Sequence, residues 1–189
     1  SWQGGEDYLK HYFFDPTGMK NTGVHNSKQT RNNEATGYSY TDGRPEKAIN
    51  WDMSRAGGAG NLYSTTQDLY RWNEAVYNGK LLSPDALKLA FTPVRINDGG
   101  QGNALGGQYG YGWMLTKKRG LKEIGHSGGL PGWSAYLTRY PEQNLTITIL
   151  ANALPPAPDL VPSTQQTELP ISTCGSEWNL WSPLLRTKV

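Results

Sequence analysis

The segment from Tyr111 to Asn152 constrains the fold more than any other part of the chain. Apolar and polar side chains alternate from Trp133 to Tyr140, and they alternate again from Leu145 to Ile149. A period of two is typical of strands that bury one face on a core. Together with strands expected at 111–116 and 121–127, these two segments predict an antiparallel sheet.

Helical patterns occur earlier in the chain. Glu6 to Phe14 is expected to form a short helix. Ser64 and Gln67 have the spacing of a capping box, which satisfies free N–H groups where a helix begins. A helix is therefore expected from this point to Gly79, because glycine suits the position after a helix end. Ser83–Asp85 predicts another short helix, with serine as the cap and proline in the first helical position.

The remaining segments carry loop signals. Residues 20–50 are polar without a clear period, so an ordered loop with a hairpin near Tyr38–Thr41 is expected. Residues 99–108 are rich in glycine and are expected to form a loop or linker. The chain then divides into three regions of an α+β protein: helices and loops over 1–98, the antiparallel sheet over 99–152, and a proline-rich tail of unclear fold over 153–189.

Composition excludes several function classes. The net charge is only +2, which argues against nucleic acid or an anionic membrane as a partner. Cys174 is the sole cysteine, and His11, His25 and His126 lack the spacing of metal ligands, so neither a metal nor another cofactor is expected. No stretch approaches the roughly 20 apolar residues of a membrane span. Nothing in these residues directs export, so the compartment stays open.

The run from His126 to Trp133 carries the chemistry. His126 and Ser127 offer polar side chains, and they precede Gly128 and Gly129. Glycines let a ligand approach the backbone, whose N–H groups can then stabilise a developing oxyanion. The purely structural alternative is that this run is only the end of a strand that leads into a turn.

Three segments, in order, resemble serine β-lactamase-like hydrolases. Phe14–Thr22 resembles the segment written PLGM-x-x-T in that family, and Gly57–Leu69 resembles its GGLYST-x-x-D-L helix start. Gly125–Trp133, followed by Tyr140–Glu142 and Leu150–Asn152, resembles its third catalytic motif, K-T-G or H-x-G. The pattern is similar to bacterial class C β-lactamases, D-alanyl-D-alanine peptidases and related esterases, which implies part of the β-lactamase/transpeptidase-like fold.

The resemblance implies roles for four catalytic-site residues. His126 or Ser127 would bind a substrate carboxylate or polarise a tyrosine, Gly128 would complete the H-x-G motif, and the N–H group of Gly129 would donate to the oxyanion. It implies a small acyl substrate, namely a β-lactam, a D-alanyl peptide or an ester. Members of this family are commonly periplasmic or secreted.

Two family motifs are missing from these residues. No serine is followed by lysine in the pattern S-x-x-K, and no tyrosine stands in a Y-x-N pattern. The family places both before the segment that Glu6–Met19 matches, so this chain is expected to be the C-terminal part of the hydrolase and to be inactive alone. Two alternatives remain: a non-catalytic fragment that binds a ligand or self-associates through exposed sheet, and a truncated gene product without selected function.

Overall fold

The computed structural model describes residues 5–26, 28–29, 31–41, 44–49, 52–53, 56–96, 102–104 and 107–153. These residues belong to one compact unit, Ser1–Ala157. The tail expected over 153–189 lies outside the described residues, apart from Ala153.

The first helix is longer than the sequence pattern indicates. It begins as α1 (Gly5–Leu9), continues as a π-helical segment (Lys10–Phe14) and ends with α2 (Asp15–Thr17). Pro16 lies at the start of the α2 segment, directly after the π-helical segment, and the helix continues for only one residue beyond it. The helix ends at Gly18, whose φ of +72° favours glycine.

The next two helices form where they are expected. α3 (Thr66–Tyr77) begins one residue later than the capping-box prediction, because Thr65 rather than Ser64 accepts the capping hydrogen bond from the Asp68 N–H group. α4 (Pro84–Ala90) is capped by Ser83, as predicted.

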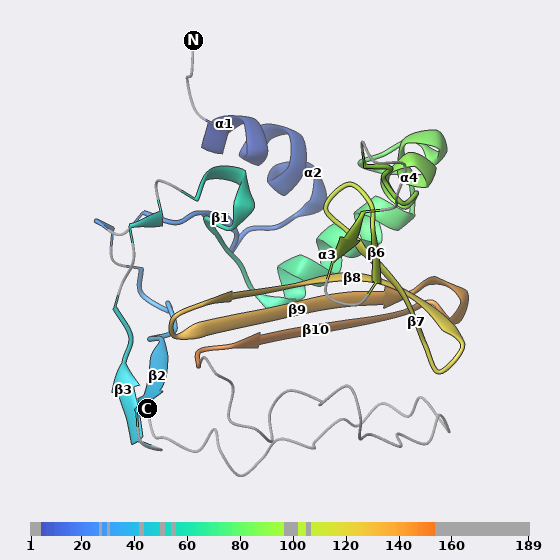
Figure 1. Cartoon of the computed structure of the whole chain (residues 1–189). Helices are drawn as coiled ribbons and strands as arrows, with labels where there is room; N and C mark the ends of the chain where they lie inside the picture. Colours follow the sequence, from blue (N-terminus) through green and yellow to red (C-terminus); the bar gives the residue numbers. More distant parts are fainter. Residues whose placement is uncertain are drawn as a thin grey trace, which may run out of the picture. The chain divides into compact units, whose positions relative to one another are not determined.

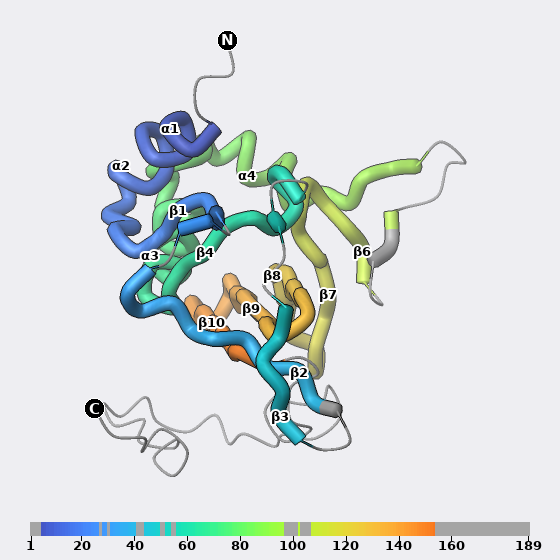
Figure 2. Tube along the Cα trace, turned by 90° about the vertical axis from the view of Figure 1, so that its left-hand side faces the viewer, coloured from blue at the N-terminus to red at the C-terminus, as the bar shows by residue number. Residues whose placement is uncertain are grey.

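The main sheet has, within the described residues, six antiparallel strands in the order β10-β9-β8-β7-β6-β5. Figure 1 shows α3 lying across one face of its central strands, and Figure 2 shows β8, β9 and β10 nearly end-on. The strands are β5 (Asn103–Ala104), β6 (Gly107–Tyr109), β7 (Met114–Lys118), β8 (Leu121–Leu130), β9 (Trp133–Tyr140) and β10 (Leu145–Ala151). The expected α+β fold is thereby confirmed.

Three strand boundaries differ from expectation. Part of the glycine-rich stretch 99–108 is not loop, because β5 and β6 pair there through their backbones. The strand expected at 111–116 begins at Met114 instead, after a turn in which Gly112 has a φ of +76°. β8 continues to Leu130, three residues past the predicted end, so glycines at its far end do not stop it.

Short pairings complete the fold. β1 (Gly23–Val24) pairs with β4 (Leu62–Tyr63), and a single 3-10 turn, Gly57–Ala59, precedes β4. The hairpin expected near Tyr38 is confirmed as β2 (Tyr38–Thr41) paired with β3 (Arg44–Lys47).

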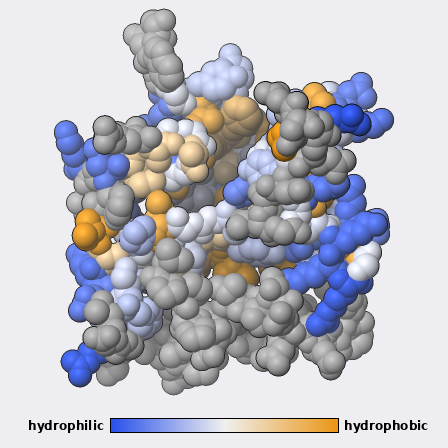
Figure 3. Space-filling view, viewed as in Figure 1, coloured by the Kyte–Doolittle hydropathy of each residue, from blue (hydrophilic) through white to orange (hydrophobic). Residues whose placement is uncertain are grey.

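Hydrophilic side chains cover the β7–β8 hairpin (Figure 3), where Lys117, Arg119 and Lys122 are exposed.

A buried arginine joins α3 to the sheet. Arg139 of β9 forms an ion pair with Glu74 of α3 and donates hydrogen bonds to Thr146 and Asn144. Its guanidinium carbon lies 4.8 Å from the centre of the Tyr77 ring. Burial raises the pKa of Tyr77 well above its ordinary value, although the charge of Arg139 lowers it. These contacts fix the helix against one face of β9 and β10.

A carboxylate joins three strands on the other face. Glu123 of β8 accepts hydrogen bonds from Thr116 of β7 and from the hydroxyls of Tyr136 and Tyr140 of β9. Burial raises the pKa of Glu123, but these hydrogen bonds and the charge of Lys118 outweigh it, so the pKa lies below its ordinary value. Burial and the nearby carboxylate raise the pKa of Tyr140 to about 12. Over the physiological pH range the Glu123 carboxylate is therefore charged, and the two phenols are neutral and donate hydrogen bonds to it.

Candidate active site

The run His126–Leu130 forms the outer part of β8 and has an open edge. β9 pairs with β8 along the whole of this run. β7 pairs only with the other end of β8, since its first residue, Met114, lies opposite Gly125. In the part of the chain that the structure describes, no strand pairs with His126–Leu130 on the β7 side. Backbone N–H and C=O groups there can pair with an extended ligand.

His126 stands at the start of this open edge and both of its ring nitrogens have partners. Nδ1 lies 2.5 Å from the carbonyl oxygen of Ser127. Nε2 lies 2.9 Å from the hydroxyl of Tyr109, the last residue of β6. The rings of His126 and Tyr109 are nearly perpendicular, with centres 5.8 Å apart. The imidazole is therefore held in a defined place.

The other three predicted site residues contribute in different ways. Ser127 lies opposite Tyr136 of β9, so alternation places its side chain on the sheet face opposite to that of His126. Gly128 returns to the His126 face, and a Cβ atom added there would meet nothing within 4 Å. Gly129 pairs with Ser134 and lies within the open edge. The four residues share one strand edge, but the histidine and serine side chains do not converge.

Tyr109 belongs to this site, although sequence reasoning did not single it out. Its only signal is the pattern Tyr109-Gly110-Tyr111-Gly112-Trp113, which indicates a tight glycine turn. That pattern does not show which residue the phenol contacts, because His126 lies 17 positions farther along the chain.

The other two family-like segments meet each other. Asp68 in the first turn of α3 is fully buried and accepts hydrogen bonds from the Asn21 N–H group at 2.7 Å and the Thr22 hydroxyl at 3.0 Å. The Thr22 hydroxyl also lies 2.8 Å from the hydroxyl of Ser64. The segments 14–22 and 57–69 are therefore joined around one carboxylate, which is a structural arrangement.

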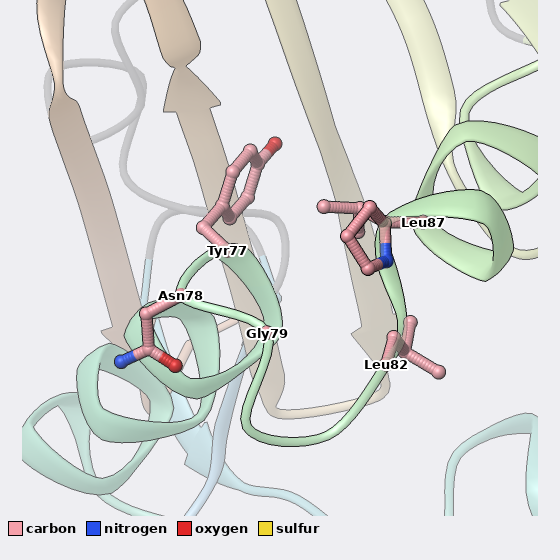
Figure 4. A pocket seen from close by; sticks show the side chains of 6 residues that line it. Tyr77, Asn78, Gly79, Leu82 and Leu87 are labelled. Carbon is pink, nitrogen blue, oxygen red and sulfur yellow. The ribbon is translucent and has the colours of Figure 1, made fainter.

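A separate pocket lies between α3 and α4. It has a volume of about 260 Å³ and is lined by Tyr77, Asn78, Gly79, Leu82, Pro84 and Leu87. Figure 4 shows Tyr77 on one side of this pocket and Leu82 and Leu87 on the other. None of the His126–Gly129 residues lines it, so the pocket and the motif are different places.

Neither metal nor membrane features accompany the site. The described residues bring no three His, Cys, Asp or Glu side chains together as a metal ion would require. Among those same residues, none of the helices combines the length and the apolar character needed to cross a bilayer.

Comparisons with known proteins place the chain in a family. A family model described as Beta-lactamase matches residues 3–169. Penicillin-binding protein 4* from Bacillus subtilis (strain 168) is 32% identical over 161 residues, which cover 77% of this chain and 34% of that protein. The chain thus spans about a third of the length of this curated relative.

Solved structures share the fold. A D-stereospecific amidohydrolase from Streptomyces sp. superposes with a TM-score of 0.65 at 24% identity, covering 78% of this chain and 44% of that chain. An octameric penicillin-binding protein homologue from Pyrococcus abyssi gives a TM-score of 0.62 at 23% identity, covering 78% of this chain and 33% of that chain. The match of the family model to most of the sequence shows that this chain belongs to the β-lactamase family.

Proposed function

We propose that this chain supplies one wall of a serine acyl-hydrolase site. The wall is the open edge of β8 from His126 to Leu130, and the five-residue overhang of β8 past β7 is the observation that carries the proposal. An acyl substrate in extended conformation pairs with this edge as an added strand would. The Gly129 N–H group then serves as one of the donors to the oxyanion.

The nucleophile comes from polypeptide other than these 189 residues. The sequence holds neither an S-x-x-K nor a Y-x-N pattern, and histidine with an oxyanion donor does not perform acyl transfer without a nucleophile. The substrate is a β-lactam, a D-alanyl peptide or an ester. Support for this class comes from the family and from the similarity to penicillin-binding protein 4*.

Two measurements on the 189-residue chain test this assignment. Incubation with a labelled penicillin, followed by intact-mass analysis, is expected to give no covalent adduct. Titration with N-acetyl-D-alanyl-D-alanine, followed by amide chemical shifts, is expected to perturb His126–Leu130 and to leave the residues of the α3–α4 pocket unchanged. A stoichiometric adduct on any serine, or shifts confined to the pocket, would overturn the proposal.

Self-association is the second candidate, and the outer edge of β10 favours it. Within the described residues, β10 is the last strand of the sheet; it carries no charged side chain and exposes Leu145 and Leu150. Long uncharged edge strands are ready templates for pairing with another chain. Sedimentation velocity is expected to show concentration-dependent dimers that Leu150→Lys dissociates. A monomer at every concentration would exclude this route.

A further inference from the structure

We propose that Tyr109 is a positioning residue for His126, and that it selects one tautomer of the imidazole at the open edge of β8. The consequence for ligand binding rests on the proposed function. The contact itself rests on geometry alone, so the two can fail separately.

The hydrogen bonds of His126 assign the donor and the acceptor in the pair. A carbonyl oxygen only accepts, so the 2.5 Å contact with the Ser127 oxygen places a hydrogen on Nδ1 of the neutral ring. Nε2 then carries a lone pair, and the Tyr109 hydroxyl, 2.9 Å away, donates to it. The two contacts select the same tautomer, because each is lost or reversed when the hydrogen moves from Nδ1 to Nε2.

The backbone fixes where the phenol stands. Tyr109 accepts a hydrogen bond from the Val94 N–H group at 2.9 Å and donates its own N–H group to the Gly102 carbonyl at 2.8 Å. The next residue, Gly110, lies so close to the carbonyl of Ala90 at the end of α4 that a Cβ atom would overlap it. Both the N–H and the C=O group of Tyr109 are thus held by backbone contacts, and its hydroxyl reaches His126 past the first residue of β7.

This arrangement changes what the edge presents to a ligand. With Nδ1 on a carbonyl and Nε2 on a phenol, the neutral His126 has no nitrogen left for a substrate carboxylate. Donation to Nε2 makes the Tyr109 oxygen a stronger acceptor, since linked hydrogen bonds polarise one another. Of the His126–Tyr109 pair, the phenol oxygen is therefore the atom that keeps acceptor capacity, which suits a substrate N–H or O–H group.

The variant Tyr109→Phe tests the assignment because it keeps the aromatic ring and removes only the hydroxyl. The readout is the pair of ring-nitrogen shifts of His126, measured without ligand by long-range proton–nitrogen correlation at mildly alkaline pH, where imidazoles are neutral. The wild-type chain is expected to show the Nδ1–H tautomer, and Tyr109→Phe is expected to shift the population toward Nε2–H. Tyr111→Phe, at a side chain that is 63% exposed, is the matched control and leaves the pattern unchanged.

Two results overturn the inference. One is a wild-type spectrum dominated by the Nε2–H tautomer. This result does not depend on whether any variant folds. The other is a Tyr109→Phe spectrum identical to the wild-type spectrum. Titration with N-acetyl-D-alanyl-D-alanine separates the two proposals: weaker binding by Tyr109→Phe supports both. Failure of the wild-type chain to bind contradicts the proposed function and leaves the tautomer result intact.

Discussion

Asp68→Ala is expected to lower the free energy of unfolding by about 3 kcal/mol, which for a unit of this size lowers Tm by about 10 °C. Asp68 is fully buried, and its loss removes the acceptor for the Asn21 N–H group and the Thr22 hydroxyl. Unpaired buried donors account for most of the cost. Arg71, the other partner, is 41% exposed and turns to water at little cost. Thermal and urea melts measure the change.

Two further substitutions sharpen this test. Asp68→Asn keeps one oxygen, and Oδ2 alone accepts from both Asn21 and Thr22. Its loss of stability is therefore expected to be about half that of Asp68→Ala. Asp85→Ala, at an exposed aspartate in the first turn of α4, is the matched control and changes stability by about 0.5 kcal/mol or less. Equal effects for Asp68 and Asp85 would contradict the structural role of the buried carboxylate.

Asp68 also shows which part of the family pattern is structural. The segments 14–22 and 57–69 carry the resemblance together with the H-S-G-G run, and they meet around Asp68. A sequence motif records that residues are required, and it does not record whether packing or chemistry requires them. Only the contact between residues 47 positions apart separates the two.

Local signals predicted the elements well and their boundaries less well. Alternation placed β9 from Trp133 to Tyr140 at both ends, although both faces of this strand are covered: Thr138 and Arg139 point to opposite faces and are both buried. The same rule missed β5, β6 and the last three residues of β8, where pairing depends on backbone contacts with neighbouring strands. The cap of α3 moved by one residue because the Ser64 hydroxyl is committed to Thr22, far away in sequence.

The candidate site likewise contains residues that the sequence could predict and one that it could not. His126, Ser127, Gly128 and Gly129 are adjacent in sequence, so a motif can name them. Tyr109 reaches His126 only because β7 starts opposite Gly125 and leaves space past its first residue. That space depends on strand register, which no local pattern carries.

Gly128→Ala is expected to leave the fold intact and to weaken binding of N-acetyl-D-alanyl-D-alanine about tenfold or more, the effect of one lost backbone hydrogen bond. A methyl group on Gly128 meets nothing within 4 Å in the folded chain, so stability changes by about 1 kcal/mol or less. The same methyl stands beside the open edge, on the His126 face, and blocks close approach of a ligand to the backbone. Shift titration and thermal melts on one sample measure both properties.

Gly132→Ala provides the opposite pattern and completes the test. Gly132 has a φ of +91°, and a Cβ atom there would overlap Ala48 and lie 3.1 Å from the Gly37 carbonyl carbon. Its substitution is expected to cost about 2 kcal/mol or more through strain and overlap at the β8–β9 turn. Because Gly128 and Gly132 lie four residues apart in one motif, the pair separates a glycine that the ligand requires from a glycine that the fold requires. Unchanged peptide binding by Gly128→Ala would remove the open edge of β8 as the binding site, whatever the stability of either variant.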